Sequence, residues 1–244
     1  MTAVIIQARL GSTRLPGKTM KELCGKPMLY YSVRRSSFAK YADEVIVATT
    51  TSEIDDAIIQ WCKNNGIPYY RGDEEDVLDR YYQAAKEFKV DIIVRVTSDC
   101  PFIDPEIIDM LILMLKNFDH DYVTNRWKKR TWPHGLDTEV LTFNTLEKAW
   151  KEAREPFERE HVTPYILRHP ELFRIHEVPY KEDLSYIRLT VDYPEDFMFA
   201  EKLMTILLEK YGEQFSWKNI FDVLEKKPEL LRINENRRQT ELKL

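Results

Sequence analysis

The residues most suited to chemistry lie in one loop near the N-terminus, directly after the apolar run Val4–Ile6. The loop brings cations, hydroxyl groups and glycines together in close succession: Arg9, Gly11, Ser12, Thr13, Arg14, Gly17 and Lys18. Glycines let a backbone approach a ligand closely, free amides point at phosphate oxygens, and cations neutralise the phosphate charge. The composition therefore predicts an anion site. The alternative is a solvated basic loop after an edge strand, which this spacing does not favour.

The loop matches none of three common active-site motifs. A Walker loop has the form GxxxxGK[ST], whereas here five residues separate Gly11 from Gly17 before Lys18 and Thr19. A dinucleotide fingerprint would need GxGxxG, and a serine hydrolase would need a GxSxG elbow. The phosphate chemistry must therefore be of another kind.

Two aspartates far apart in the sequence each follow an apolar segment. Asp99 comes after Asp91–Ser98, and Asp192 comes after Ile187–Val191. Taken alone, either aspartate is best explained as a turn or helix-cap residue. Mg²⁺, however, takes one or two carboxylates and completes its shell with water and substrate phosphates. Together with the first loop, Asp99 and Asp192 predict a magnesium site.

These side chains need a sheet to bring them together, and the first half of the chain predicts one. Four apolar segments are expected to be strands, namely Val4–Ile6, Glu44–Thr49, Ile67–Tyr70 and Asp91–Ser98. Helical patterns alternate with them, at Pro27–Ala39, at Glu53–Asn65 (capped by Ser52 and ended by Gly66), from Arg71-Gly72 to about Phe88, and at Pro105–Asn117. This alternation is typical of an α/β fold with a doubly wound, mostly parallel sheet in three layers. Ligands of such sheets lie beyond the carboxyl ends of the strands.

The second half is less regular. Strands are predicted at Asp121–Asn125, Thr138–Leu141, Phe173–Val178 and Tyr186–Val191, and helices at Thr145–Arg154, Phe157–Arg168, Pro194–Tyr211 and Trp217–Glu225. We interpret residues 1–244 as a single domain in which residues 121–180 form an inserted arm. The polar end, Asn234–Leu244, is expected to be frayed.

Composition narrows the class of partner. Charged residues make up 32% of the 244 residues and the net charge is −5, which disfavours nonspecific binding to nucleic acid. Cys24, Cys62 and Cys100 are widely spaced, which favours a reducing, cytoplasmic environment over a disulfide framework or a zinc site. The sequence shows neither a signal-peptide pattern nor an apolar run long enough for a bilayer, so no membrane association is expected.

The run Ala8-Arg9-x-Gly-Ser-x-Arg-x-Pro-Gly-Lys resembles the signature loop of sugar nucleotidyltransferases. It is most similar to the cytidylyltransferases that activate acidic sugars such as Kdo and the sialic acids, and within them to the spore coat polysaccharide biosynthesis protein F type. The resemblance implies a nucleotide-diphospho-sugar transferase-like fold, CTP and a sugar acid or sugar phosphate as substrates, Mg²⁺ as cofactor, and release of pyrophosphate.

The resemblance also implies roles for single residues. Arg14 and Lys18 match the residues that hold the triphosphate, and Asp99 and Asp192 match the metal ligands. Arg9 and the backbone of Ala8–Leu10 match the region that meets the base and the ribose. The full nucleotide site is then expected to comprise Ala8, Arg9, Leu10, Gly11, Ser12, Arg14, Lys18, Arg71, Thr97 and Ser98.

Several further candidates have competing explanations. Arg71 could reach a phosphate or the base, or could belong to a charge cluster at a helix start. Arg95 lies inside an apolar strand and needs a partner, either Asp79 or a ligand. The segment Trp127–Glu139 carries four candidate acceptor contacts, although it could equally pack a homodimer: His134, Gly135, Asp137 and Glu139. His161 is a further candidate for substrate contact, or a packed helical residue.

The sequence thus favours a magnesium-dependent nucleotidyltransferase that uses CTP, with Arg14, Lys18, Asp99 and Asp192 as its catalytic set. A general base is not identified. Two other classes stay open. One is a glycosyltransferase of the related fold, which would bind a finished sugar nucleotide. The other is a non-catalytic nucleotide-binding partner in polysaccharide assembly.

Overall fold

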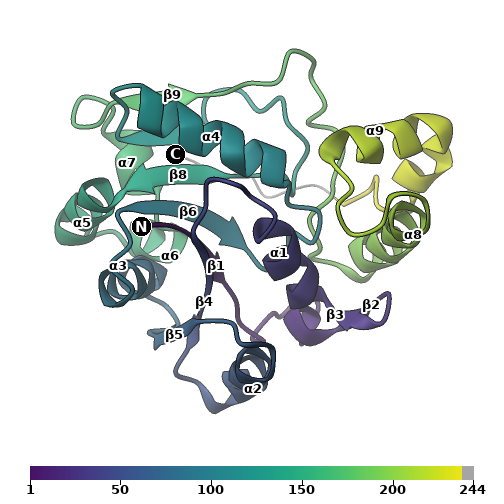
Figure 1. Ribbon diagram of the computed structural model, residues 1–244, viewed down its shortest axis with the longest axis horizontal. Helices are drawn as coiled ribbons and strands as arrows, with labels where there is room; N and C mark the ends of the chain where they lie inside the picture. The colour runs from purple at the N-terminus through teal and green to yellow at the C-terminus, as the bar shows by residue number, and fades with distance from the viewer. Residues whose placement is uncertain (238–244) are drawn as a thin grey trace.

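A seven-stranded sheet organises the computed structural model, which describes residues 1–237 (Figure 1). Its strands, in the spatial order β5-β4-β1-β6-β8-β7-β9, are β5 (Tyr69–Gly72), β4 (Glu44–Thr50), β1 (Thr2–Gln7), β6 (Ile92–Thr97), β8 (Glu139–Thr142), β7 (Tyr122–Thr124) and β9 (Ile175–Glu177). From β5 to β6 the strands run parallel, whereas β8 is antiparallel to both of its neighbours. The prediction of an α/β fold with a mostly parallel sheet is confirmed.

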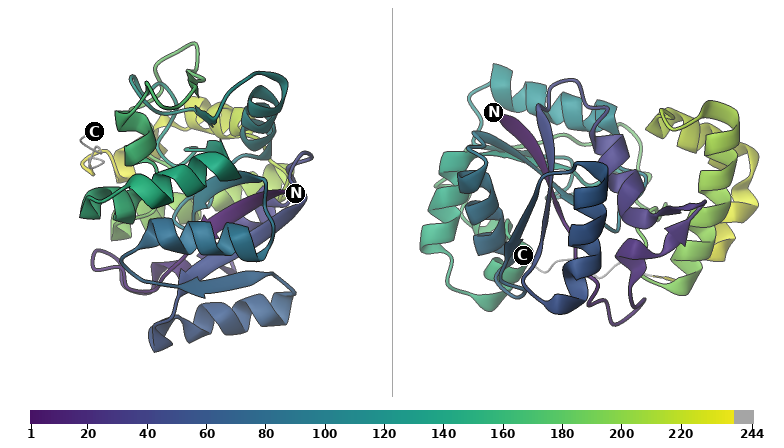
Figure 2. Two further views of the ribbon diagram at one scale, coloured as in Figure 1. Left: turned by 90° about the vertical axis from the view of Figure 1, so that its left-hand side faces the viewer. Right: turned by 60° about the horizontal axis from the view of Figure 1, so that its bottom comes forward.

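Helices cover both faces of this sheet (Figure 2). They are α1 (Met28–Ser36), α2 (Asp56–Asn65), α3 (Val77–Glu87), α4 (Pro105–Asn117), α5 (Phe143–Glu152), α6 (Pro156–His161), α7 (Pro164–Arg168), α8 (Pro194–Tyr211) and α9 (Trp217–Lys226). Short 3-10 helices lie at η1 (Lys18–Met20), η2 (Glu53–Asp55) and η3 (Pro228–Ile233), and β2 (Glu22–Leu23) pairs with β3 (Lys26–Pro27) beside α8.

The central strand β1 shows why the fold has two cores. Val4 and Ile6 belong to a core that also contains buried residues of α1, α2, α4, α8 and α9, whereas Ala3 and Ile5 belong to a core with buried residues of α3, α5 and α7. Successive side chains of a strand point to opposite faces, so an unbroken apolar run is buried on both sides. The run at the start of the sequence therefore holds the three layers together.

Local signals set several helix boundaries. Gly66 ends α2 in the left-handed conformation, with φ of 65°, as its position after the helical pattern predicts. The Asp104 side chain accepts hydrogen bonds at the start of α4, directly before Pro105. Ser52 precedes η2, but its side chain makes no capping hydrogen bond, so that part of the prediction is wrong.

Two predicted elements differ from the structure. Residues 157–168 do not form one helix, because Val162 adopts φ of 72° and Pro164 then opens α7. Residues 186–191 form no strand within the described residues. Apart from one isolated bridge between His134 and Arg188, the segment bonds to loops instead of a neighbouring strand.

The structure also places residues 121–180 and the start of the C-terminal segment. Residues 121–180 contribute β7, β8 and β9 to the main sheet. Asn234 is buried, and Arg237 pairs with Glu195, so fraying does not begin at Asn234. The rest of the predicted tail, residues 238–244, lies outside the described residues.

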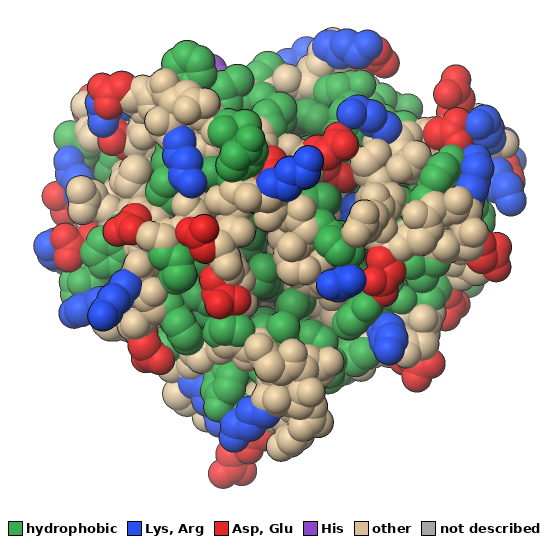
Figure 3. Space-filling view, viewed as in Figure 1, with side chains coloured by type: hydrophobic (Ala, Val, Ile, Leu, Met, Phe, Trp, Pro, Cys, Tyr) green, Lys and Arg blue, Asp and Glu red, His purple; other side chains and the backbone are tan. Residues whose placement is uncertain are grey.

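The outer surface mixes charges of both signs. On the face shown in Figure 3, Lys and Arg side chains are interspersed with Asp and Glu side chains. Among residues 1–237, no helix has the length and apolar character needed to cross a membrane.

Candidate active site

One ammonium group brings the two predicted aspartates together. Lys18 Nζ donates hydrogen bonds to Asp99 Oδ2 at 3.0 Å, to Asp192 Oδ1 at 2.8 Å and to the carbonyl oxygen of Val191 at 2.8 Å. Lys18 opens η1 directly after Gly17, whose φ of 69° turns the loop back toward the sheet. Three segments that are distant in the sequence thus meet at the carboxyl end of β1.

The neighbours of Asp99 keep it ionised. Burial alone would raise the pKa of this carboxyl group, but the Lys18 ammonium and a hydrogen bond from the Thr97 hydroxyl lower it to about 2. Burial likewise opposes the charged form of Lys18, and the two carboxylates outweigh it and raise the pKa of the ammonium. At neutral pH the Lys18 ammonium therefore lies beside an ionised Asp99.

Asp192 directs its two oxygens to different sides. Oδ1 accepts from Lys18 and, at 2.8 Å, from Arg14 Nη2, whereas Oδ2 accepts from Arg188 Nη2 at 3.0 Å. The first two donors belong to the loop that follows β1, and the third lies on the segment that leads into Asp192. The first loop therefore supplies both cations on the Oδ1 side of Asp192.

This arrangement fits a divalent cation. The ammonium already stands where two carboxylates converge, and carboxylate oxygens are ligands that Mg²⁺ prefers. Within residues 1–237, no group of three or more His, Cys, Asp or Glu side chains could form a metal site. A metal held by Asp99 and Asp192 would therefore complete its shell with water and substrate phosphates.

A cleft of about 960 Å³ opens over this cluster. Its walls come from the first loop, from residues 73–77, from the end of β6 and from α6, and among the predicted site residues they include Ala8, Arg9, Gly11, Ser12, Arg14, Lys18, Thr97, Ser98, Asp99, His161 and Asp192. The cleft lies at the carboxyl ends of β1 and β6, where doubly wound sheets bind their ligands.

The first loop contains backbone amides without a partner in the described part of the chain. Part of the loop is folded on itself, since Ser12 and Gly17 donate their amides to the carbonyl oxygen of Leu10. The amides of Gly11, Thr13 and Arg14 have no hydrogen-bond partner within residues 1–237. Free amides beside cations form a concave anion site, which agrees with the composition of the loop.

Arg71 and Leu10, both predicted for the nucleotide site, make contacts that hold neighbouring loops in place. Arg71 donates to the carbonyl oxygens of Thr50 and Ser52, both at 2.9 Å, and pairs with Asp56, so it braces the turn after β4 and does not line the cleft. The amide of Leu10 donates to Asp55 Oδ1 at 2.7 Å, which anchors the start of the loop.

The candidate acceptor residues of the segment Trp127–Glu139 do not line the cleft either. Asp137 binds Arg130 at 2.5 Å, and although burial would raise the pKa of this carboxyl group, Arg130 and Arg126 lower it. Glu139 binds Arg95, so the carboxylate partner of that strand arginine is Glu139 instead of Asp79. A carboxylate withdrawn from water needs a nearby cation, and the half-buried Asp137 and the buried Glu139 each find one inside the fold.

The other two candidates in that segment support the chain that carries Asp192. The His134 amide donates to the carbonyl oxygen of Ile187 at 3.0 Å. A Cβ on Gly135 would lie 2.6 Å from the backbone nitrogen of Thr190, and the glycine has φ of 97°. The position therefore requires glycine, because the two backbones touch.

Trp132 is buried within the chain. Its ring lies 4.8 Å from Tyr180 and 5.4 Å from Trp217, centroid to centroid, and its Nε1 donates to the carbonyl oxygen of Val178. His161, in contrast, does line the cleft. Burial lowers the pKa of its imidazole below the ordinary value, which favours the neutral ring.

Gln7, which was not predicted as a site residue, lines the cleft at the end of β1. Its Oε1 accepts a hydrogen bond from Arg95 Nη2 at 3.0 Å. Arginine cannot accept a hydrogen bond, so the amide oxygen must face it and the NH₂ group stays available as a donor. A polar residue that ends an otherwise apolar strand was the signal that could have identified it.

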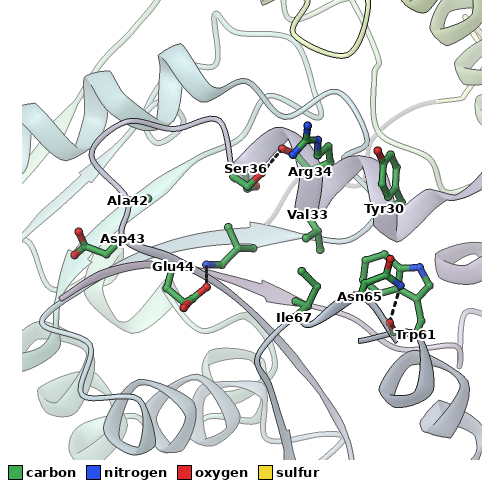
Figure 4. Close-up of a pocket in the computed structure, with 12 residues that line it drawn as sticks. Tyr30, Val33, Arg34, Ser36, Ala42, Asp43, Glu44, Trp61, Asn65 and Ile67 are labelled. Carbon is green, nitrogen blue, oxygen red and sulfur yellow. Dashed lines mark hydrogen bonds between the residues drawn. The ribbon is translucent and has the colours of Figure 1, made fainter. Parts of the chain in front are cut away.

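A second hollow, of about 340 Å³, lies between α1 and α2 beside the start of β4 (Figure 4). Its polar groups are engaged locally: Arg34 pairs with Glu213, Asp43 accepts from the Thr2 amide, and Asn65 donates to the carbonyl oxygen of Trp61. It lies at the amino end of β4, whereas the cleft lies at the carboxyl end of the adjacent β1. None of the predicted site residues lines it.

Comparison with known proteins places this architecture in a family. The family model for cytidylyltransferases matches residues 3–237. The spore coat polysaccharide biosynthesis protein SpsF of Bacillus subtilis is 37% identical, over 86% of this chain and 87% of that protein.

Among solved structures, a cytidylyltransferase from Leptospira borgpetersenii superposes with a TM-score of 0.89 at 36% identity, covering 98% of this chain and 99% of that one. A CMP:2-keto-3-deoxy-manno-octonic acid synthetase complexed with CTP shares the fold, with a TM-score of 0.64 at 19% identity over 84% of this chain and 98% of that one. The resemblance inferred from the first loop is confirmed. The chain belongs to the cytidylyltransferase family and is a nucleotidyltransferase.

Proposed function

We propose that this enzyme transfers CMP from CTP to a sugar acid or sugar phosphate, for surface polysaccharide synthesis in the cytoplasm. An oxygen of the acceptor forms a bond to the α-phosphorus, and the bond from that phosphorus to pyrophosphate breaks. The observation that carries the proposal is the Lys18 ammonium between Asp99 and Asp192, at the mouth of a loop with free amides and further cations.

Each part of the site has a task in this reaction. Arg14, Lys18 and the free amides of the first loop would hold the β- and γ-phosphates, while Ala8, Arg9 and Leu10 would border the base and the ribose. Asp99 and Asp192 would hold Mg²⁺, which supplies neutralisation of the phosphate charge when bound. Such phosphoryl transfer depends on positioning and electrostatics and needs no covalent enzyme intermediate.

The comparisons support this assignment over the alternatives. The Bacillus subtilis relative is named for spore coat polysaccharide biosynthesis, and the Kdo-activating relative of known structure was solved with CTP. Membership in the cytidylyltransferase family favours an enzyme that makes sugar nucleotides over one that consumes them. It also argues against a purely structural nucleotide-binding partner.

The acceptor side is part of the same proposal. His161 and the amide of Gln7 lie in the cleft and could contact the acceptor, whereas His134, Gly135, Asp137 and Glu139 would act by holding the surrounding backbone. A homodimer formed through other surfaces would be compatible with this arrangement.

A pyrophosphate-release screen tests the proposal. The four ribonucleoside triphosphates are each combined with Mg²⁺ and a panel of sugar acids and sugar phosphates. CTP with at least one acceptor should release pyrophosphate, and the Asp192→Asn variant should not. Release with another nucleotide alone would contradict the cytidine assignment, and transfer from a finished sugar nucleotide would contradict the proposed reaction.

A further inference from the structure

The two oxygens of Asp192 are held from opposite sides. Oδ1 faces Lys18 and Arg14 of the first loop, and Oδ2 receives the Arg188 guanidinium at 3.0 Å. Because one oxygen is fixed from behind, the carboxylate cannot rotate freely about its own axis. The side chain is therefore held with one oxygen, Oδ1 in this structure, directed at the first loop.

Arg188 does not neutralise Asp192 alone, since it has a carboxylate of its own. Its Nε donates to Asp196 Oδ1 and its Nη2 to Asp196 Oδ2, both at 2.9 Å. Both side chains are buried, at 5% and 0% exposure. A two-point pair of this kind fixes the guanidinium plane, so Arg188 can orient Asp192 while Asp196 balances its charge.

Asp196 also fixes the backbone at the start of α8. Its Oδ2 accepts the amides of Asp192 at 3.0 Å and Tyr193 at 3.1 Å. The same carboxylate therefore holds the main chain of Asp192 directly and its side chain through Arg188.

The C-terminal segment closes this arrangement. Asn234 follows η3, which packs on α8, and its Nδ2 donates to the carbonyl oxygen of Arg188 at 3.1 Å and to Asp196 Oδ1 at 3.0 Å. Asn234 is 4% exposed. A side chain from the end of the described chain thus joins the segment before Asp192 to the helix after it.

We infer that Arg188, Asp196 and Asn234 are positioning residues that present Asp192 Oδ1 to the cation of the active site, and that the segment after α9 is consequently part of the catalytic apparatus. The inference rests on the proposed role of Asp192 as a metal ligand. Residues behind a metal ligand fix its orientation, and their loss typically lowers metal affinity about 10- to 100-fold.

The test measures Mn²⁺ binding directly. Free Mn²⁺ is followed by electron paramagnetic resonance while protein is titrated at fixed CTP, without acceptor. Asn234→Ala should weaken Mn²⁺ binding by about tenfold, and Asp196→Asn by up to about a hundredfold. Glu235→Ala, an exposed neighbour on the same segment, is the matched control and should bind as the parent does.

Thermal unfolding separates positioning from general loss of structure. If Asp196→Asn fails to fold, Asn234→Ala still decides the question, because its measured affinity belongs to folded protein. Parent-like Mn²⁺ binding by a folded Asn234→Ala protein would overturn the inference, whatever its melting temperature.

Asp192→Asn distinguishes this result from failure of the proposed function. Weak Mn²⁺ binding by Asp192→Asn together with parent-like Asn234→Ala would reject the positioning role alone. Unchanged Mn²⁺ binding by Asp192→Asn would reject the metal role of Asp192, and the positioning role with it.

Discussion

Two clusters of charged side chains lie at the strand β6, one around Arg95 within the strand and one around Asp99 just after it. They differ in whether all partners of the charged groups come from the chain itself. In the interior cluster, Glu139 binds Arg95 and also accepts hydrogen bonds from Tyr122 and Thr163, so its partners all come from the chain itself. In the cleft cluster, Lys18 balances Asp99 and Asp192, but the Asp99 side chain is 26% exposed, against 3% for Glu139.

The difference in exposure and partners distinguishes charged groups that stabilise the fold from charged groups that can act on a ligand. Removing one member of a fully internal pair leaves an uncompensated charge in a medium that cannot solvate it. In the proposed reaction, an incoming cation would replace the ammonium of the cleft cluster and a phosphate would replace its carboxylates. We therefore expect the interior cluster to control stability and the cleft cluster to control turnover.

The largest effect is expected from Glu139→Gln. The change keeps the shape of the side chain but leaves the buried Arg95 without a counter-charge, and breaking such a pair costs about 3–5 kcal/mol. Urea denaturation should show this loss, whereas Glu171→Gln, at an exposed position, should be neutral. A stability equal to that of the parent would remove the distinction between the clusters.

Asp192→Asn, in contrast, should lower turnover more than stability. Loss of preorganised charge at the reacting phosphate lowers turnover roughly a hundredfold or more. Asp99→Asn should behave alike, and steady-state pyrophosphate release measures both. If either variant keeps parental turnover while folded, that carboxylate does not belong to the catalytic set.

The same comparison explains how much the sequence could reveal. The first loop, Asp99 and the four parallel strands were predictable because each depends on a local pattern: β-branched runs, a glycine at a turn, a proline at a helix start. Gly66 and Pro105 are such signals, and both act as expected. Family resemblance then placed Arg14, Lys18, Asp99 and Asp192 at one site, where the structure brings them together.

The remainder depended on contacts between distant residues. Arg95 was expected to need a partner, yet nothing in its neighbourhood points to Glu139 on an antiparallel strand. Residues 187–191 are apolar enough for a strand, but their backbone partners are His134 and Asp99, which lie in loops. Asn234 reads as part of a polar tail and becomes buried only because Arg188 and Asp196 offer it acceptors.

His134 extends the comparison to a half-buried side chain outside both clusters. Its Nδ1 has no hydrogen-bond partner within residues 1–237, and burial, aided by Arg130, lowers the pKa of the ring to about 4. Between pH 6.5 and 4 the unfolded chain therefore binds a proton that the native protein does not. Stability should fall as pH falls across this window, by up to about 1.4 kcal/mol per pH unit.

Urea denaturation at successive pH values measures this slope. His161 and His120 also have lowered pKa values, so they add to it with the same sign. The difference between the parent and His134→Gln isolates His134, and the variant should show the flatter dependence. Identical slopes would mean that His134 titrates normally in the folded protein.

The smallest effect is expected from Lys18→Ala. This variant tests most directly whether a metal ion can take the place of the Lys18 ammonium in the cleft. The variant should bind CTP about tenfold more weakly, since a charge-assisted hydrogen bond contributes about 1.5 kcal/mol, while CMP binding should change less because the lost cation faces the outer phosphates. Without nucleotide, Asp99 and Asp192 would repel each other, so Mg²⁺ should raise the melting temperature of Lys18→Ala more than that of the parent. Lys40→Ala, which removes an exposed lysine, is the control. Equal Mg²⁺ shifts in all three proteins would mean that the ammonium and the metal do not share one place, and the cleft cluster would then be as structural as the interior one.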